Sequence, residues 1–313
     1  VRGFVPSRAI QTDGSMTRFR NYILSSALLF ALCCAPMLAI AQKEVMFDQY
    51  IEAPIAINPA YTGIQEHFNL NILLRRRWFS IPSAPVTPTL YADGTVAGGR
   101  VGIGFMAMND QMSPFATTGF YGSTSYIHRT GSGWKLSLGV QGGINVLPVY
   151  GQGYSGRKML GSFGLGVLAQ NDNFYLGFSK PELLSLDFGN QNSSWGYHLP
   201  LYASTGGKIR LNEDFIATPN GTVIISNSFK NEIHIGSKLW YKKLVGAGVF
   251  FRTGQVNRIH VVAEAPVGKN VRIGYAYDSR TVESMYTPVG VGISGMHELI
   301  FRFIPNPVSF NYY

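Results

Sequence analysis

An alternation of residue type with a period of two recurs along most of the chain and constrains its fold more than any other feature. Over residues 134–145 the two phases read Trp134, Leu136, Leu138, Val140 and Ile144 against Lys135, Ser137, Gly139, Gln141 and Asn145. Successive side chains of a β-strand point to opposite faces, so each phase belongs to one face of a sheet. A bulky apolar face opposite a small or polar face is expected of the lipid and lumen sides of a transmembrane β-barrel.

The composition favours a membrane barrel over the other classes open to a chain of 313 residues. Only 14% of the residues are charged and 36 are glycine, against about 25% charged and roughly 7% glycine in ordinary soluble domains. A helical membrane protein needs several apolar stretches of about 20 residues, whereas the chain has one, near its N-terminus. The alternative is a soluble β-sandwich or lipocalin-like barrel. Its outer face would be polar, but here the polar phase is rich in glycine and the apolar phase is aromatic.

Turn-forming residues separate the alternating stretches and set the expected number of strands. We predict strands near 67–79, 86–97, 100–109, 115–129, 134–146, 161–170, 173–180, 196–210, 213–218, 222–228, 231–241, 244–253, 257–265, 271–278 and 296–303. Bacterial single-chain barrels use even numbers of strands, so one pair of these stretches, around Pro219, is expected to be a single bent strand. The predicted fold is all-β: a transmembrane antiparallel β-barrel of about 14 strands.

The one long apolar stretch has the features of a cleaved signal peptide. Met16 begins a segment with two arginines, an apolar run follows over 22–38, and the Ala-Ile-Ala of residues 39–41 forms a small-x-small cleavage pattern. We therefore predict a signal peptide over 16–41. An uncleaved anchor helix is the alternative, although two serines and a proline interrupt the apolar run.

The remaining residues are assigned around the barrel. Residues 1–15 form an upstream segment that is not expected in the mature protein, because it precedes the signal peptide. Residues 42–66 are predicted to be a periplasmic lead-in segment and 67–303 the barrel. The last residues, 304–313, are predicted to be a tail, serving either as a contact for a periplasmic partner or as a frayed end.

Cleavage at residue 41 also changes the cysteine content and the charge. Cys33 and Cys34 lie inside the signal peptide, so the mature chain has no cysteine for a disulfide, a thiolate nucleophile or a metal site. The counts of basic and acidic residues fall from 26 and 17 to 22 and 16, which lowers the net charge from +9 to +6. This excess is spread along the chain except at Arg75 to Arg77, so nucleic-acid binding is not favoured.

Motifs that carry chemistry are almost absent. Residues 151–156 and 290–295 both match G-x-G-x-x-G, but that fingerprint requires a preceding strand and a following helix, and neither copy is followed by a helical pattern. No G-x-S-x-G, H-E-x-x-H or Walker A sequence occurs. We therefore predict no catalytic residue, no cofactor, no metal site and no enzymatic activity. A hydrolase assembled from separate strands, such as an outer-membrane lipase or protease, is the alternative that motifs do not test.

The phase opposite the aromatic residues in the C-terminal strands is charged. Its charged residues are Arg252, Arg258, His260, Glu264, Arg272, Asp278, Glu298 and Arg302. An arginine facing lipid at the bilayer midplane costs about 2–4 kcal/mol, so these side chains are expected to face the lumen. Two interpretations follow: structural ion pairs between neighbouring strands, or the lining of a substrate-selective pore. Replacing Arg252 or Arg272 with leucine should destabilise the barrel under the first and change its conductance under the second.

A series of short motifs occurs in a fixed order along nearly the whole mature chain. The series comprises Asp48-Gln49-Tyr50, Ile57-Asn58-Pro59-Ala60-Tyr61-Thr62-Gly63, Arg75 to Trp78, Ala84-Pro85-Val86-Thr87, Asn109-Asp110 with Pro114, Phe251-Arg252-Thr253-Gly254, Arg272 to Asp278 and Gly295-Met296-His297-Glu298. In order and spacing these motifs resemble the PorP/SprF family of outer-membrane proteins of the type IX secretion system in Bacteroidetes. Residues 150–160, 181–197 and the tail depart from that pattern.

The resemblance implies a non-enzymatic barrel in the outer membrane of a Gram-negative bacterium, working in protein secretion and gliding motility. Its implied partners are the translocon, the periplasmic ring and secreted cargo with C-terminal sorting signals, besides outer-membrane lipid. From the position of the lead-in segment we predict that Asn58, Pro59 and Tyr61 contact a partner, with Asn58-Pro59 as a turn. The alternative function is a porin-like nutrient channel.

Overall fold

The computed structural model describes residues 53–77, 84, 86–112, 115–151, 154–187, 200–226, 230–254, 257–279 and 295–305. The predicted signal peptide, the upstream segment, Trp78, the second glycine-rich motif and nearly all of the C-terminal tail lie outside these residues. Within the described residues, no helix is long and apolar enough to cross a membrane.

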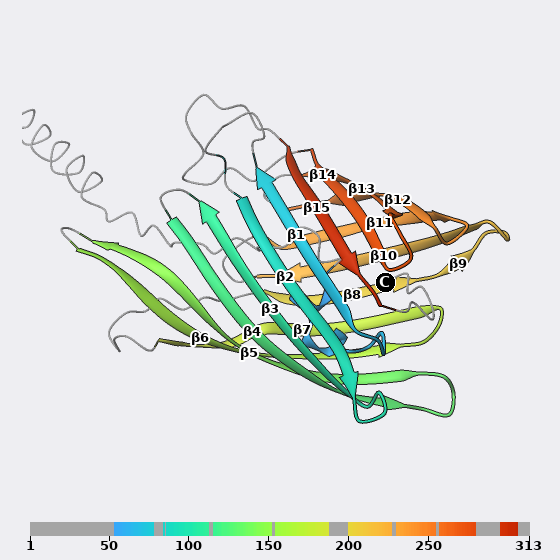
Figure 1. Ribbon diagram of the computed structural model, residues 1–313, viewed down its shortest axis with the longest axis horizontal. Helices are drawn as coiled ribbons and strands as arrows, with labels where there is room; N and C mark the ends of the chain where they lie inside the picture. Colours follow the sequence, from blue (N-terminus) through green and yellow to red (C-terminus); the bar gives the residue numbers. More distant parts are fainter. Residues whose placement is uncertain are drawn as a thin grey trace, which may run out of the picture. The chain divides into compact units, whose positions relative to one another are not determined.

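Antiparallel strands make up nearly all of the described chain (Figure 1). They are β1 (Asn69–Arg77), β2 (Val86–Val96), β3 (Val101–Met112), β4 (Phe115–Arg129), β5 (Lys135–Gly151), β6 (Tyr154–Gln170), β7 (Phe174–Asp187), β8 (Leu201–Gly207), β9 (Ile209–Arg210), β10 (Phe215–Ile225), β11 (Glu232–Tyr241), β12 (Val245–Arg252), β13 (Arg258–Pro266), β14 (Val271–Asp278) and β15 (Met296–Phe303). Each pairs with its neighbour along the chain, except that β8 and the short piece β9 both pair with β10 instead of with each other.

The sheet is a closed barrel of 14 strands, as predicted. β1 pairs with β15 from Leu70↔Phe303 to Arg77↔Met296, so the first and last strands lie side by side, as the cyan and red arrows of Figure 1 show. The two-residue β9 and β8 pair with the same strand, β10, so together they form one interrupted strand. β10 runs unbroken through Pro219, which confirms the single strand expected there. Closure leaves no sheet edge to expose unpaired backbone groups to lipid.

The two phases of the sequence become the two faces of the wall. In β12 burial alternates strictly, from exposed Val245 to fully buried Arg252. Exposed positions around the barrel are large and apolar, whereas buried ones include most of the charged and polar strand residues. The apolar phase therefore faces outward, and the small or polar phase faces the lumen.

Strands β5, β6 and β7 are longer than the sequence indicated. We expected β5 to stop before Pro148, but β5 and β6 stay paired from Lys135↔Gln170 to Gly151↔Tyr154. Gly151 and Tyr154 form the last pair of this ladder, so the described residues of the glycine-rich stretch 151–156 belong to strands. The sequence misleads here because proline and glycine usually mark turns, while a hairpin tolerates them where a ladder bond is not needed.

The strand connections give the barrel an orientation. Brief turns at 97–100, 130–134, 171–173, 211–214, 242–244 and 267–270 all lie at the end where β1 begins and β15 finishes. The connections at the other end include the longest, 188–200 and 279–295, besides two of only two residues each, 113–114 and 152–153. Outer-membrane barrels have short periplasmic turns and longer extracellular loops, so the end with the brief turns is periplasmic.

Candidate functional site

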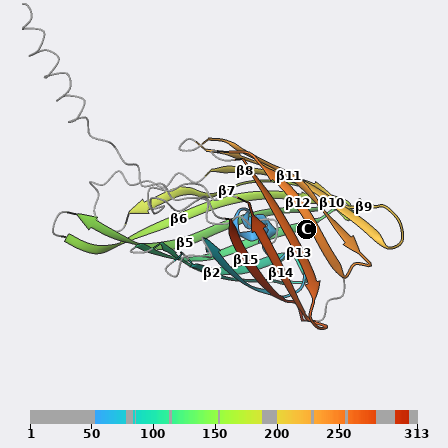
Figure 2. The same cartoon turned by 90° about the horizontal axis from the view of Figure 1, so that it is seen from above.

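A segment ahead of the first strand lies inside the barrel, where Figure 2 shows it in blue within the ring of strands. It contains two short 3-10 helices, η1 (Pro54–Ala56) and η2 (Pro59–Tyr61). Asn58 caps η2, because its side-chain Oδ1 accepts a hydrogen bond from the Ala60 N–H at 2.9 Å. Pro59 follows at the first helical position, where its missing N–H costs nothing. We call residues 53–64 the lumen segment.

Apolar side chains of the lumen segment pack against inward-facing side chains of the wall. Ile55 belongs to a buried cluster with residues of β2, β3 and β4: Tyr91, Met106, Met108 and Tyr121. Tyr61 lies in a second cluster and meets Tyr175 of β7 edge to face, with ring centroids 6.1 Å apart. These contacts bury the apolar surface that the segment would otherwise expose to water.

Five hydrogen bonds to four strands, β2, β4, β6 and β7, hold the lumen segment. Ser179 of β7 donates to the Ile57 carbonyl and Ser125 of β4 to the Thr62 carbonyl, both at 2.6 Å. Asp93 of β2 accepts from the Gly63 N–H at 2.7 Å. Asn58 donates to the Val167 carbonyl of β6 at 3.2 Å, and Thr62 donates to Ser123 of β4 at 2.8 Å. The polar phase of the wall thus satisfies backbone groups that are buried in the lumen.

Glycines of the wall allow the lumen segment to approach closely. A Cβ atom on Gly139 of β5 would lie 2.3 Å from the Ala60 nitrogen. On Gly102 of β3 it would lie 2.1 Å from the Thr62 oxygen, and on Gly166 of β6 it would lie 2.0 Å from Asn58 Oδ1. Such distances exclude any larger side chain unless the segment moves. We call Gly102, Gly139 and Gly166 the glycine seat.

Glu66 anchors the chain where the lumen segment leaves the lumen at the periplasmic end. Its carboxylate lies 3.2 Å from Arg129 and 2.5 Å from Lys135, the last residue of β4 and the first of β5. Partial burial alone would raise the pKa of Glu66, but the hydrogen bonds and charges of Lys135 and Arg129 outweigh it and hold this pKa below its ordinary value. Glu66 adopts a positive φ of 65°, which reverses the chain towards β1.

The three residues predicted to contact a partner are all part of the lumen segment. Asn58 and Tyr61 are 1% and 6% exposed, and Pro59 is buried as well. Asn58 and Pro59 form a turn, as expected. The described part of the expected lead-in, however, packs against the inner wall instead of extending into the periplasm. Sequence reasoning missed this placement because the contact of Asn58 with Val167 joins residues far apart in the chain.

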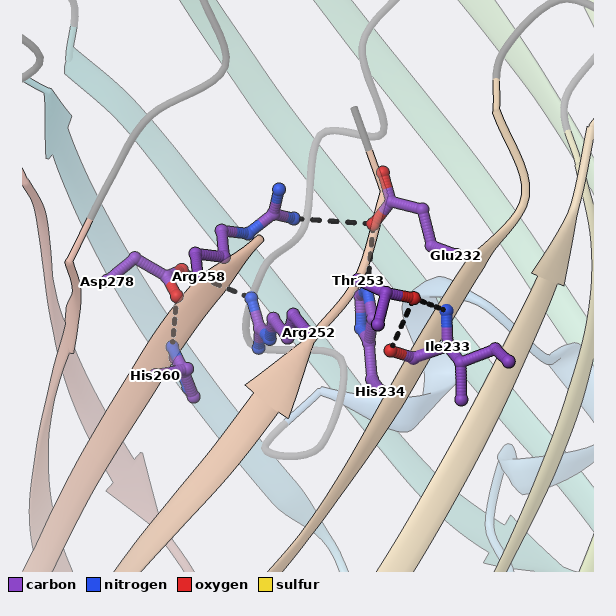
Figure 3. Close-up of polar contacts among 8 residues, drawn as sticks. All are labelled: Glu232, Ile233, His234, Arg252, Thr253, Arg258, His260 and Asp278. Carbon is purple, nitrogen blue, oxygen red and sulfur yellow. Dashed lines mark hydrogen bonds and ion pairs between the residues drawn. The ribbon is translucent and has the colours of Figure 1, made fainter. Parts of the chain in front are cut away.

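The predicted charged residues do face the lumen, and several gather near its extracellular end (Figure 3). Arg252 of β12 reaches Asp278 of β14 at 3.1 Å, and His260 of β13 contacts the same carboxylate at 3.2 Å. Arg258 lies 3.4 Å from Glu232, the first residue of β11. We call this group the upper charge cluster; each contact in it joins different strands.

His234 and Thr253 complete the region that Figure 3 draws. His234 of β11 lies 2.7 Å from Glu232, so this carboxylate contacts both a histidine and Arg258. Thr253 accepts a hydrogen bond from the Ile233 N–H at 2.9 Å and thereby extends the backbone pairing of β11 and β12. The strand register and the side-chain contacts thus support each other at this end.

Glu264 of β13 is the centre of a second group, the lower charge cluster. Its carboxylate lies 2.6 Å from Arg272, 3.5 Å from Arg302 and 3.8 Å from Lys238. Arg272 and Lys238 also lie over the ring of Trp240, at 5.4 and 5.5 Å from its centroid. Three cations around one carboxylate and one aromatic ring fill the lumen beside these strands.

Glu298 also faces the lumen as predicted, and the three arginines of β1 alternate between the two faces. Arg75 and Arg77 are buried on the lumen side and Arg76 faces outward, as the alternation required. Glu298 of β15 is buried and stands opposite Arg75 in the strand register. Opposite charges at directly paired positions stabilise an antiparallel pair.

Three partners in these clusters were missed from the sequence. Glu232, His234 and Lys238 belong to β11, one strand before the region that drew attention. His234 and Lys238 occupy the inward phase of that strand. The period-two alternation places both on the polar phase of 231–241, but the predicted charge group began at Arg252 and did not include them.

A model of the family described as "Type IX secretion system membrane protein PorP/SprF" matches residues 39–303. The chain belongs to this family. It is therefore a membrane component of the type IX secretion system, and its closed barrel places it in the outer membrane. Membership also implies interaction with other components of that system.

Distant structural likenesses include outer-membrane proteins. The outer membrane protein Omp33 of Acinetobacter baumannii is 8% identical, with a TM-score of 0.43 over 76% of this chain and 98% of that one. The KdgM porin in complex with disordered oligogalacturonate is 8% identical, with a TM-score of 0.37 over 78% and 99%. The Escherichia coli outer membrane phospholipase A is 12% identical, with 0.36 over 77% and 92%. No curated protein matches the chain.

Proposed function

We propose that this protein is a non-enzymatic adaptor of the type IX machinery, linking secretion partners or cargo at the outer membrane. The observation that carries the proposal is the occupied lumen. The lumen segment is hydrogen-bonded to four strands of one side of the wall, and the charge clusters lie on the other. A barrel filled in this way is suited to holding partners rather than passing solutes.

The state of the lumen charges supports an adaptor over a porin. Glu264 is 6% and Asp278 2% exposed, and each carboxylate contacts cations on neighbouring strands. Charges that select a solute must meet that solute in water, whereas buried pairs mainly hold strands in register. These contacts favour the structural interpretation of the predicted charge group.

The histidines of the upper charge cluster also support a non-enzymatic role. His260 and His234 each contact a carboxylate that an arginine contacts too. A catalytic base must lie within hydrogen-bond reach of a nucleophile, besides being oriented by a third group. Here the carboxylates join strands through arginines instead.

Planar-bilayer recordings of the purified barrel test the adaptor against the porin. An occupied lumen predicts that the barrel conducts little. Steady conductance at the level of a porin would contradict the proposal and favour the nutrient channel. Hydrolysis of phospholipid or casein by the folded barrel would contradict its non-enzymatic part.

The partners that we propose are the translocon, the periplasmic ring and cargo with C-terminal sorting signals, with gliding motility as the expected phenotype. Affinity purification of the tagged barrel from native membranes should recover these proteins. Recovery of the barrel alone, under conditions that preserve the other type IX complexes, would contradict the linking role.

Asn58, Pro59 and Tyr61 remain the proposed partner contacts, reached from the periplasmic end of the lumen. Replacing all three with alanine should abolish secretion while the abundance of the folded barrel stays unchanged. Gly142→Ala on the outer face of β5 is the matched control, because a Cβ there meets nothing within 4 Å. Loss of the barrel itself in the triple variant would refute docking and leave these residues a structural role.

A further inference from the structure

The outward face of six consecutive strands carries two ionisable residues side by side. These strands are β12, β13, β14, β15, β1 and β2, in their order around the barrel. Their other outward residues, within the described ranges, are aliphatic, aromatic, proline or glycine. The two exceptions, Arg76 of β1 and His297 of β15, stand directly opposite each other in the strand register.

Their height in the wall places the pair at the outer membrane surface. Arg76 is one residue before the end of β1, and His297 is one residue after the start of β15. Both positions lie at the end opposite the brief turns, which is the extracellular end. An outward arginine costs about 2–4 kcal/mol at the bilayer midplane but only about 0–1 kcal/mol near the interface. The pair therefore lies at the level of the outer-leaflet head groups.

Two tyrosines of β14 surround His297. The Tyr275 hydroxyl lies 2.6 Å from His297 Nδ1, and the ring of Tyr277 lies with its centroid 5.1 Å from the histidine ring. Tyr277 is also the register partner of His297. When the Tyr275 hydroxyl donates to Nδ1, the neutral imidazole carries its proton on Nε2, which is a donor. The tyrosines thus fix the ring and its tautomer.

We propose that Arg76 and His297, positioned by Tyr275 and Tyr277, bind the phosphate of a phosphorylated glycolipid in the outer leaflet. The guanidinium supplies a permanent positive charge and a planar fork of donors, which matches a phosphate better than any other side chain does. The imidazole adds a donor, and the tyrosines lie where aromatic residues contact the polar part of a lipid. Charge complementarity and height select this ligand over the acyl chains that cover the rest of the face.

Lipid A is the probe for the test, and the intact folded barrel is titrated with it in detergent micelles. The wild-type protein should bind lipid A about tenfold more tightly than enzymatically dephosphorylated lipid A, because charge-assisted hydrogen bonds to phosphate are lost. This comparison needs no variant. Equal affinities for the two lipids would refute the proposal whatever the variants do.

A second arm locates the site. The Arg76→Gln/His297→Gln variant should lose the preference for phosphate, whereas Arg157→Gln, at an exposed arginine of β6, should keep it. Arg76→Lys should retain part of the preference, because it keeps the charge and loses the fork. A preference that persists in the double variant would refute the assigned site. Equal binding of phosphatidylglycerol and lipid A by the wild-type protein would refute the glycolipid as the ligand.

Discussion

Replacing Gly139 with alanine should release the lumen segment while leaving the barrel closed. The added Cβ would lie 2.3 Å from the Ala60 nitrogen and from the Pro59 carbonyl carbon, whereas ordinary contact begins at 3.4 Å. The difference between these two distances requires a shift of at least 1.1 Å. The clash is between backbone atoms on the segment side, so no side-chain rotation relieves it. Overpacking of this kind typically costs about 1–3 kcal/mol.

Hydrogen exchange measures this effect directly. If the added methyl group lowers the free energy of local opening of the lumen segment by about 1–3 kcal/mol, its amides should exchange about 5- to 150-fold faster, at tenfold for each 1.4 kcal/mol. Amides of the wall strands should exchange as before, because the strand pairing is untouched. Gly142→Ala is the matched control on the same strand, since a Cβ there meets nothing within 4 Å. Equal exchange in the two variants would refute the glycine seat.

Further predictions concern the charges. Arg252→Leu should lower the free energy of unfolding by about 3–5 kcal/mol, because it leaves the buried Asp278 carboxylate without the arginine that lies 3.1 Å away. Urea unfolding of the detergent-solubilised barrel measures this loss. Unchanged stability with altered conductance would instead indicate a pore lining. Glu66 should stabilise the fold above its ordinary pKa of 4.5 and lose this contribution as the pH falls through its lowered folded pKa. The melting temperatures of wild type and Glu66→Gln should therefore differ at neutral pH and converge in acid, and a constant difference would contradict the ion pair.

The wall could be predicted from the sequence because each strand is a local, two-sided pattern. The strands at 115–129, 271–278 and 296–303 begin and end where the alternation does. The inward direction of the charges followed from the same pattern, because a charge on the lipid face is penalised. The ends of β5 and β6 could not be predicted in this way. Pro148 and the nearby glycines usually mark the end of a strand, but here the strands continue through them.

The contents of the lumen could not be predicted, because they depend on contacts between distant parts of the chain. Asn58 meets Val167 across 109 residues, and Ile57 meets Ser179 across 122. No periodicity marks such pairs, and Ala53 to Ile64 read as an ordinary polar and apolar mixture. The pairing within the charge clusters was hidden for the same reason: alternation places Arg252 and Asp278 on one face but does not say which carboxylate each arginine reaches.

The inner wall divides into two parts by residue type, and this division explains why a chain so rich in glycine still has a filled lumen. On β3, β5 and β6, the lumen segment occupies the space that side chains would take if the glycine seat were made of larger residues. On β11 to β15 large inward side chains, among them arginines, Lys238 and Trp240, fill the space themselves, and the inward Gly246 and Gly248 leave room for Trp240 and Lys238. An open pore would need water-facing polar side chains around the whole circumference. Glycine on one side and ion pairs on the other are instead what a barrel needs when a segment of its own chain packs inside it.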